Sequence, residues 1–238
     1  MAKLRTANNS YTTSILSSSS SFSMVEAYKK LRTNLMFALP GTACKKILVI
    51  SSVPDEGKST VCANLGITLA QMSERILLID CDLRNPSLHR VFKTKGLPGL
   101  SEVLAGMIHF EEAVIPLKLE GLHVLPAGTI PPNPAELLGS DAMGTLLQDL
   151  ALQYDYILLD SPPLDAVSDA VVLTPKVNGT VVVVREGSTE HPQLQRTLAA
   201  LQFAEAKVLG LILSDSKTLA KQGYGKYSKY GKYGYGNK

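Results

Sequence analysis

Six short apolar runs follow one another along the chain, and stretches with helical spacing separate them. The runs cover residues 46–51, 75–80, 122–125, 156–160, 180–184 and 208–213. Nearly continuous apolar runs are typical of parallel strands buried on both faces by helices. The pattern predicts an α/β fold with a mostly parallel sheet and helices on both faces. Ligands of such sheets bind beyond the carboxyl ends of the strands, so the residues after each run are the first candidates for a site.

A change in polarity marks the limits of this domain. Residues 1–23 are rich in Ser, Thr and Asn, and we expect them to be disordered because they bury too little apolar surface to repay ordering. The apolar spacing in residues 24–39 predicts a helix before the first strand, ended at Pro40. We expect a single domain over residues 24–216 and a flexible segment over 217–238.

Composition narrows the class of protein. The chain has 238 residues and 45% hydrophobic content, which suits one large α/β domain. No stretch approaches the roughly 18 consecutive apolar residues of a membrane span, and the N-terminus has no apolar signal-peptide core, so we expect a cytoplasmic protein. The three cysteines, Cys44, Cys62 and Cys81, form no CxxC pair, which predicts structural or buried thiols.

The net charge of +3 conceals an uneven distribution. Six of the 24 basic residues lie in residues 217–238, which contain no acid, so 18 basic and 21 acidic residues remain in the preceding part. The body is therefore mildly acidic and the C-terminal segment strongly basic. Such a segment suits either solubility or an attraction to phosphate, anionic lipid or an acidic cleft.

A glycine-lysine-serine sequence follows the first apolar run and precedes a helical stretch. This is the pattern of a phosphate-binding loop (P-loop), in which Lys58 is expected to contact the β/γ-phosphate oxygens and Ser59 to bind Mg²⁺. Ser52 stands where the motif has its first glycine, so an ordinary strand-turn-helix joint is the alternative for the loop alone. The residues expected to bind the nucleotide are Asp55, Glu56, Gly57, Lys58, Ser59 and Thr60.

Acidic residues end two other runs. Asp80 and Asp82, at positions i and i+2 of an extended segment, point the same way, and such a pair is costly unless a cation lies near it. Asp160 ends its run in the manner of a Walker B aspartate, which holds Mg²⁺ directly or through water. An ordinary turn or helix cap is the alternative for the first pair. We predict a magnesium site formed by Ser59, Asp82 and Asp160.

Taken together, these motifs resemble the bacterial tyrosine kinases (BY-kinases), in the small cytoplasmic form of capsular and exopolysaccharide biosynthesis. The resemblance begins at Glu26 and includes the family's GPxPPNPxELL block at residues 128–138. The family typically has glycine where Asp55 stands, so we expect the Asp55 side chain to face solvent. The motifs that correspond to Walker A, A′ and B are residues 57–59, 76–84 and 157–163.

The resemblance implies a P-loop NTPase-like fold and a protein-tyrosine kinase that uses ATP and Mg²⁺. Lys58, Asp80 and Asp82 would be catalytic. Asp80 is the candidate base toward the tyrosine hydroxyl, while Asp82 and Asp160 serve magnesium. Arg84 is expected to pair with a carboxylate.

Two other classes share this fold. ParA/MinD-type ATPase switches carry a signature lysine five positions before the loop lysine, where this chain has Val53. Iron–sulfur scaffolds of the same class require paired cysteines. The ParA/MinD type is the stronger of the two alternatives to a kinase.

The C-terminal segment favours the kinase. Its glycines prevent a stable helix and leave tyrosine hydroxyls exposed. A sticky low-complexity segment and an RNA-binding segment are alternatives for this composition. Behind a BY-kinase-like core the resemblance implies an autophosphorylation region, with no nucleic acid required. The expected sites are Tyr224, Tyr227, Tyr230, Tyr233 and Tyr235.

Three residues on one face of the expected first helix, Glu26, Lys29 and Arg32, resemble the family's ExxRxxR assembly motif, with lysine in place of the first arginine. A solvated charged face is the alternative. The motif implies a ring-shaped homo-oligomer in which each C-terminal segment is phosphorylated in trans. The resemblance further implies a separate membrane-bound activator of the polysaccharide co-polymerase type, which would hold the kinase at the inner face of the membrane. Other protein substrates and a cognate tyrosine phosphatase are implied as well.

Overall fold

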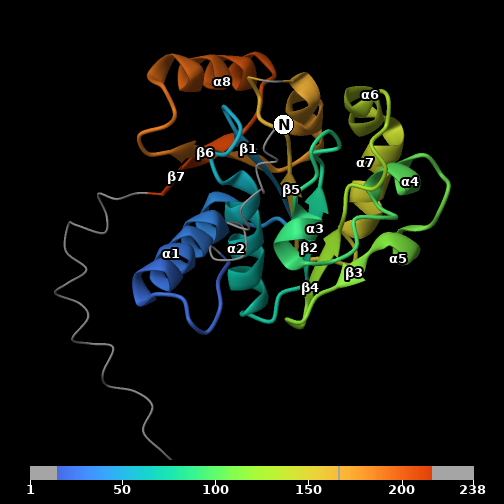
Figure 1. The fold of residues 1–238 in the computed structure, drawn as a ribbon, viewed down its shortest axis with the longest axis horizontal. Helices are drawn as coiled ribbons and strands as arrows, with labels where there is room; N and C mark the ends of the chain where they lie inside the picture. Colours follow the sequence, from blue (N-terminus) through green and yellow to red (C-terminus); the bar gives the residue numbers. More distant parts are fainter. Residues whose placement is uncertain (1–14, 166, 216–238) are drawn as a thin grey trace, which may run out of the picture.

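The computed structural model describes residues 15–165 and 167–215 and contains a seven-stranded sheet with the strand order β3-β4-β2-β5-β1-β6-β7 (Figure 1). Neighbouring strands are parallel except β3 and β4, which are antiparallel. The prediction of a mostly parallel sheet is confirmed. The strands are β1 (Lys45–Ser51), β2 (Ile76–Asp80), β3 (Ile115–Pro116), β4 (Leu122–Leu125), β5 (Tyr156–Asp160), β6 (Gly179–Arg185) and β7 (Val208–Ser214).

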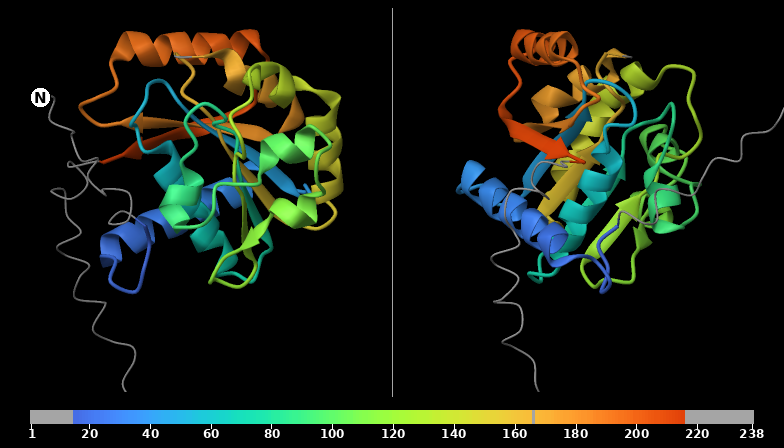
Figure 2. Two further views of the ribbon diagram at one scale, coloured as in Figure 1. Left: turned by 45° about the vertical axis from the view of Figure 1, so that its right-hand side comes forward. Right: turned by 60° about the vertical axis from the view of Figure 1, so that its left-hand side comes forward.

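Helices cover both faces of the sheet, as Figures 1 and 2 show. One face carries α1 (Phe22–Ala38), α2 (Lys58–Ala70) and α3 (Leu88–Phe92). The helices of the other face are α4 (Leu100–Leu104), α5 (Phe110–Ala113), α6 (Pro134–Gly139), α7 (Asp141–Leu150), the 3₁₀ helix η2 (Ser168–Lys176) and α8 (His191–Phe203).

The two faces bury alternate residues of the same strands. In β1, Ile47 and Val49 belong to the core beneath α1 and α2, whereas Leu48 and Ile50 belong to the core beneath α7 and α8. All four side chains are fully buried. This alternation explains why the central residues of β1 are all apolar.

The six predicted strands are present within two residues of their expected limits. The two-residue β3 was not predicted, because a segment so short, and containing a proline, has no strand pattern of its own. It pairs only because β4 presents an edge to it.

The N-terminal boundary differs from the prediction. Helix α1 begins at Phe22, two residues before the expected start, and the Ser21 hydroxyl caps it by accepting a hydrogen bond from the Met24 amide. The expectation of disorder through residue 23 is therefore wrong for residues 15–23. The polar composition led to a wrong prediction because the serines form hydrogen bonds with the backbone. In addition, Leu16 N donates a hydrogen bond to Asn64 Oδ1 of α2 at 2.8 Å.

The remaining composition-based predictions concern the cysteines, membrane spans and the C-terminal segment. The three cysteines are free and buried, as expected, and burial raises the pKa of each thiol. Within residues 15–165 and 167–215, no helix is both long and apolar enough to cross a membrane. The expected flexible segment at residues 217–238, with its five tyrosines, lies outside the described residues, as do residues 1–14.

Candidate nucleotide and magnesium site

The phosphate-binding loop joins the carboxyl end of β1 to the first turn of α2. Gly57 is the N-cap of α2 and has φ +88°, a left-handed conformation that glycine adopts without strain. Asp55 also has positive φ, +63°, and its side chain is exposed, as predicted. Because aspartate is one of the few non-glycine residues that tolerate this region, it occupies a position that glycine also suits.

Ser52, which replaces the first glycine of the P-loop motif, fits the loop. Its φ is not positive, so its Cβ causes no backbone strain. The side chain is buried, and Thr197 Oγ1 of α8 donates a hydrogen bond to Ser52 Oγ at 2.9 Å. The Ser52 carbonyl accepts from Asp165 N at 3.0 Å. The departure from the motif is therefore compensated by contacts that hold the loop.

The Glu56 side chain braces the loop from the inside. It is 1% exposed and accepts hydrogen bonds from Val53 N and from Thr189 Oγ1. The Glu56 carbonyl accepts from Ser214 Oγ at 2.6 Å. Any contact of Glu56 with a phosphate would therefore come from its backbone amide.

Arg185, at the end of β6, holds the outer side of the same loop. Its Nη1 donates to the Asp55 carbonyl at 3.0 Å, and its Nη2 forms an ion pair with Asp215 at 2.9 Å. The last strands of the sheet thus set the backbone of the phosphate-binding loop.

A cavity of about 230 Å³ opens over the loop and the start of α2. Five of the six predicted nucleotide-binding residues line it, and Glu56 does not. The lining residues from the loop and α2 are Pro54, Asp55, Gly57, Lys58, Ser59 and Thr60, and those from elsewhere are Asp82, Arg84, Asn85, Ser87, Arg90, Pro162, Pro163 and Val167.

Two acidic residues meet beneath this cavity because their strands are neighbours. Asp80 of β2 and Asp160 of β5 are register partners, and both are fully buried. Burial, and then the neighbouring Asp160 carboxylate, raises the pKa of Asp80 to about 7. Burial also raises the pKa of Asp160, against the lowering effect of Lys58. Two buried carboxylates side by side favour a bound proton or a nearby cation.

The Asp80 carboxylate is occupied by the backbone of the segment that follows β2. Its Oδ1 accepts from Asp82 N, and its Oδ2 accepts from Ser87 N and Leu88 N at 2.8 and 2.9 Å. Asp80 therefore holds the turn that leads into α3. Asp82 lines the cavity and Asp80 does not, so the division of roles between them stays a prediction.

Two of the three predicted magnesium ligands, Ser59 and Asp160, lie around one hydroxyl. Ser87 Oγ lies 2.7 Å from Ser59 Oγ and 3.3 Å from Asp160 Oδ2. Lys58 Nζ lies 3.6 Å from Asp82 Oδ2, with both side chains largely buried. Asp160 Oδ1 is buried and has no hydrogen-bond partner, which suits a cation or a water bound to one.

The donor set fits magnesium better than a metal that requires a full protein cage. The described residues contain no group of three or more His, Cys, Asp or Glu side chains that could hold a metal by themselves. Mg²⁺ typically takes one or two carboxylates, and phosphate and water complete its octahedron. Ser59, Asp82 and Asp160 would supply oxygen ligands of this kind.

Arg84 pairs with a carboxylate, as predicted. Its Nε and Nη2 donate to Asp169 at 2.7 and 3.1 Å, and the Asp169 side chain is 1% exposed. The pair joins the segment after β2 to η2 on the other side of the cavity. Arg84 also lines the cavity, so its role is not limited to this pair.

Sequence reasoning missed Ser87 and Arg90. Both lie within ten residues after Asp80, Ser87 at the N-cap of α3 and Arg90 inside this five-residue helix, which is too short to give a periodic pattern in the sequence. The sequence signal that could have identified them is their position shortly after Asp80 and Asp82 in the chain.

The residues of the predicted assembly motif have partners within the chain. Lys29 forms an ion pair with Glu26 at 2.7 Å, and Arg32 Nη1 donates to the Thr68 carbonyl of α2 at 2.8 Å. Their role between subunits stays a prediction.

The block at residues 128–138 follows the carboxyl end of β4 and continues into α6. Its first residues are held by Glu102, whose Oε2 accepts from Gly99 N and whose Oε1 accepts from Thr129 N. A Cβ at Gly128 would collide with the Glu102 carboxylate. The glycine is therefore required for this approach.

Comparisons with known proteins agree on the fold. The family model described as ParA, NUBPL iron-transfer P-loop NTPase, matches residues 42–237. Tyrosine-protein kinase YwqD of Bacillus subtilis (strain 168) is 40% identical over 202 residues, which are 85% of each chain. Tyrosine-protein kinase wzc of Salmonella typhimurium is 33% identical over 205 residues, which cover 85% of this chain and 28% of wzc. The chain thus spans most of YwqD but less than a third of wzc.

The solved structures that match this chain include kinase domains and a MinD protein. The kinase domain of Escherichia coli tyrosine kinase ETK has a TM-score of 0.77 and 33% identity and covers 85% of this chain and 81% of its own. The chimerical protein CapA2B2 has a TM-score of 0.76 and 34% identity, and the match covers 79% of this chain and 83% of CapA2B2. The septum site-determining protein MinD of Pyrococcus horikoshii, complexed with Mg-ADP, has a TM-score of 0.61 and 25% identity. That match covers 73% of this chain and 72% of MinD. The kinase domains are the more similar group by both measures.

Proposed function

This chain belongs to the bacterial tyrosine kinases, and from that premise we propose that it transfers the γ-phosphoryl group of ATP to tyrosines, including Tyr224, Tyr227, Tyr230, Tyr233 and Tyr235 of its own C-terminal segment. The observation that carries the proposal is that Lys58, Ser59 and Asp82 line one cavity at the carboxyl edge of the sheet, and that the buried Asp160 carboxylate lies 3.3 Å from the hydroxyl of Ser87, which lines the same cavity. YwqD, with 40% identity, bears the name of a tyrosine-protein kinase and supports the reaction class.

The loop residues would bind the triphosphate. The α2 N-terminus and the amides of the loop favour a phosphate group, and Lys58 adds a fixed positive charge at the γ-phosphate. Ser59, Asp82 and Asp160 would hold Mg²⁺, which neutralises the charge that develops on the phosphate oxygens. Arg84 and Arg90, which line the same cavity, lie where they can offset further negative charge.

Asp80 remains the proposed base. In the transfer, the tyrosine oxygen bonds to the γ-phosphorus, the bond to the leaving ADP oxygen breaks, and the hydroxyl proton passes to a carboxylate. The raised pKa of Asp80, about 7, suits a group that accepts a proton near neutrality. Because Asp80 also holds three backbone amides, this role requires the turn at residues 82–88 to yield when a substrate enters.

The finer biological context belongs to the same proposal. Glu26, Lys29 and Arg32 are proposed to connect subunits into a ring in which C-terminal segments are phosphorylated in trans. A membrane-bound activator of the polysaccharide co-polymerase type would recruit the kinase to the inner face of the membrane, and a cognate tyrosine phosphatase would reset it. A role in capsular or exopolysaccharide biosynthesis and the phosphorylation of other proteins are part of the proposal because the motifs of this chain resemble those of the small cytoplasmic BY-kinases.

The alternatives are less well supported. Val53 stands at the position of the ParA/MinD signature lysine, and its amide is used inside the loop by Glu56. Iron–sulfur ligation needs thiolates, whereas burial raises the pKa of Cys44, Cys62 and Cys81 and keeps these thiols neutral.

The test is to incubate the purified full chain with MgATP, with and without a cytoplasmic peptide of a candidate activator, and to map phosphotyrosine by mass spectrometry. We expect phosphate on the tyrosines of the C-terminal segment of the wild type and none on those of the Lys58→Met variant. ATP hydrolysis without phosphotyrosine under all conditions would favour the ATPase-switch alternative. Light scattering of the triple variant Glu26→Ala/Lys29→Ala/Arg32→Ala tests the ring separately, since monomers with weak self-phosphorylation are expected.

A further inference from the structure

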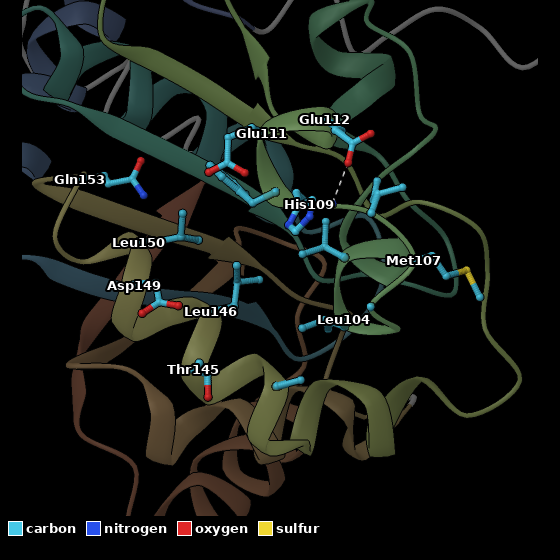
Figure 3. Close-up of a pocket in the computed structure, with 15 residues that line it drawn as sticks. Leu104, Met107, His109, Glu111, Glu112, Thr145, Leu146, Asp149, Leu150 and Gln153 are labelled. Carbon is cyan, nitrogen blue, oxygen red and sulfur yellow. Dashed lines mark hydrogen bonds between the residues drawn. The ribbon is translucent and has the colours of Figure 1, made fainter.

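A second hollow, of about 570 Å³, lies between the segment that carries α4 and α5 and helix α7 (Figure 3). We call it the α5–α7 groove. Its floor is formed by Leu104, Phe110, Leu146 and Leu150, three of them buried and one half-buried. Met107, which is 73% exposed, lies at one end of it. The groove therefore offers apolar surface to an occupant.

The rim of the α5–α7 groove is acidic. Glu111 of α5 and Asp149 of α7 lie on opposite walls, and both are exposed (Figure 3). No Lys or Arg lines the groove, and none of the ion pairs found within residues 15–165 and 167–215 includes either acid. The third acid, Glu112, caps α5 by accepting a hydrogen bond from His109 N at 2.9 Å. Two carboxylates thus remain available to a cationic partner.

We propose that the α5–α7 groove is a docking site for the C-terminal segment, residues 217–238, which binds there with its lysines at the acidic rim and tyrosine rings on the apolar floor. The segment contains six lysines, five tyrosines and no Asp or Glu, so its charge and its aromatic content complement both parts of the groove. A flexible thioether such as Met107 adapts readily to an aromatic ring. The consequence for catalysis rests on the proposed function, whereas the binding itself does not.

Chain length allows this docking. The groove lies on the β3–β4 side of the sheet, opposite the edge at which β7 ends (Figure 1). Seven strands at about 4.8 Å spacing make the sheet roughly 29 Å wide. An extended chain covers about 3.3 Å per residue, so Tyr224 can lie about 30 Å from Asp215 and Tyr235 about 66 Å. The segment is long enough to reach the groove of its own molecule or of a neighbouring copy.

Phosphorylation of its tyrosines would release the docked segment from the groove. Each phosphotyrosine adds a charge of roughly −1.5 to −2 near neutral pH, so five would add about −8 to −10 to a segment with six lysines. A segment of reversed charge is repelled by Glu111 and Asp149. The groove would therefore retain unmodified segments near the kinase and release finished ones.

A binding measurement separates this proposal from kinase activity. A fluorescent peptide of residues 217–238 is titrated, without ATP, against the full chain in which the six lysines of its own segment are changed to Gln, so that this segment does not compete. We expect Glu111→Gln/Asp149→Asn to raise Kd about 2- to 30-fold at low salt, the range given by two exposed ion pairs. The matched control Glu120→Gln/Glu205→Gln removes the same charge from exposed residues outside the groove and should leave Kd unchanged. Equal Kd values for the two double variants would overturn the proposal.

Two further arms test the occupant. The peptide with five phosphotyrosines should not bind, and Met107→Ser should raise Kd by an amount that does not depend on salt. Carbodiimide crosslinking of the unmodified full chain, followed by mass spectrometry, should join lysines of residues 217–238 to Glu111 or Asp149. Crosslinks from these acids to Lys29 or Lys30 instead would show that a folded surface of a second copy occupies the groove, and would overturn the assignment.

Kinetics then connect docking to catalysis. With the peptide as substrate, Glu111→Gln/Asp149→Asn should raise KM and leave kcat unchanged, whereas a short neutral tyrosine peptide should show neither change. If the peptide binds as expected but no variant or wild type phosphorylates it, the docking site survives and the proposed kinase function fails.

Discussion

The candidate nucleotide and magnesium site and the α5–α7 groove each include three carboxylates but hold them in opposite ways. Those of the nucleotide and magnesium site are the cavity-lining Asp82 and the fully buried Asp80 and Asp160, and they are held by backbone amides, Lys58 and Ser87. Those of the groove, Glu111, Glu112 and Asp149, are exposed, and two of them have no cationic partner among the described residues. Buried charges require fixed partners, because leaving one unpaired is costly, whereas exposed ones are satisfied by water. Substitutions in the cavity should therefore have large effects on chemistry and stability, and substitutions in the groove small ones that appear only with a ligand.

The largest effect is expected from Lys58→Met. Lys58 supplies the main fixed positive charge at the terminal phosphates, and hydrogen bonds to charged groups contribute about 1.5–3 kcal/mol each. Loss of two such bonds lowers ATP affinity about 10²-fold or more and abolishes tyrosine phosphorylation. Nucleotide titration by calorimetry and a phosphotyrosine assay are the measurements. Unchanged ADP binding and phosphorylation in a folded Lys58→Met protein would refute the site assignment.

The next effect distinguishes the two Walker A′ acids. Asp80→Asn is expected to bind MgATP nearly normally and to slow transfer by about 10²–10⁴-fold, as loss of a general base typically does. Asp82→Asn, which alters a cavity-lining carboxylate, is expected to raise the magnesium concentration required for half-maximal rate. If both variants show the same magnesium dependence and the same rate, the division of roles is wrong.

The pH dependence of stability tests the buried pair directly. The pKa of Asp80 is raised from its ordinary value of 3.8 to about 7, so the folded chain retains a proton there that the unfolded chain has already released. The contribution of Asp80 to the free energy of unfolding of the magnesium-free protein is therefore highest at acidic pH and falls as pH rises from about 4 to about 7. Asp80→Asn should lose this component, which we expect to be about 1 kcal/mol or more. Urea unfolding at several pH values measures it, and parallel curves for wild type and variant would contradict the assignment.

A moderate effect is expected where β6 and β7 brace the loop. Thr189→Val keeps the shape of the side chain but removes the hydroxyl that donates to the buried Glu56 carboxylate and accepts from Arg185 N at 2.9 Å. We expect a loss of about 1–2 kcal/mol of unfolding free energy, because the buried carboxylate loses a partner. ATP affinity should fall with it. Thr145→Val, an exposed substitution on α7, is the control and should change neither quantity.

The smallest effect on the protein alone is expected in the groove. Glu111→Gln/Asp149→Asn should change the unfolding free energy by no more than about 0.5 kcal/mol, because both side chains are exposed. Thermal unfolding checks this. A large loss of stability would mean that these acids are structural, and the comparison between cavity and groove would no longer hold.

The sequence by itself determined the parts of this protein whose physics is local or periodic. Strand positions followed from continuous apolar runs, because a strand covered on both faces has no room for polar residues. The positions of Lys58, Ser59 and Asp160 at strand and helix ends followed from the same logic, because parallel strands present their carboxyl ends at one edge. The motifs also led to the kinase family, which the comparisons confirmed.

Only the tertiary structure decided which groups meet across the chain. Glu56 belongs to the loop motif, yet its side chain pairs with Thr189, 133 residues away. Asp80 and Asp82 look equivalent in the sequence, but the turn into α3 encloses the first and leaves the second at the cavity. Ser87 reaches Ser59 and Asp160 only because three separate elements converge, and the α5–α7 groove exists only because α4 packs against both α5 and α7. Contacts of this kind depend on the packing of distant segments, which neither spacing nor composition encodes.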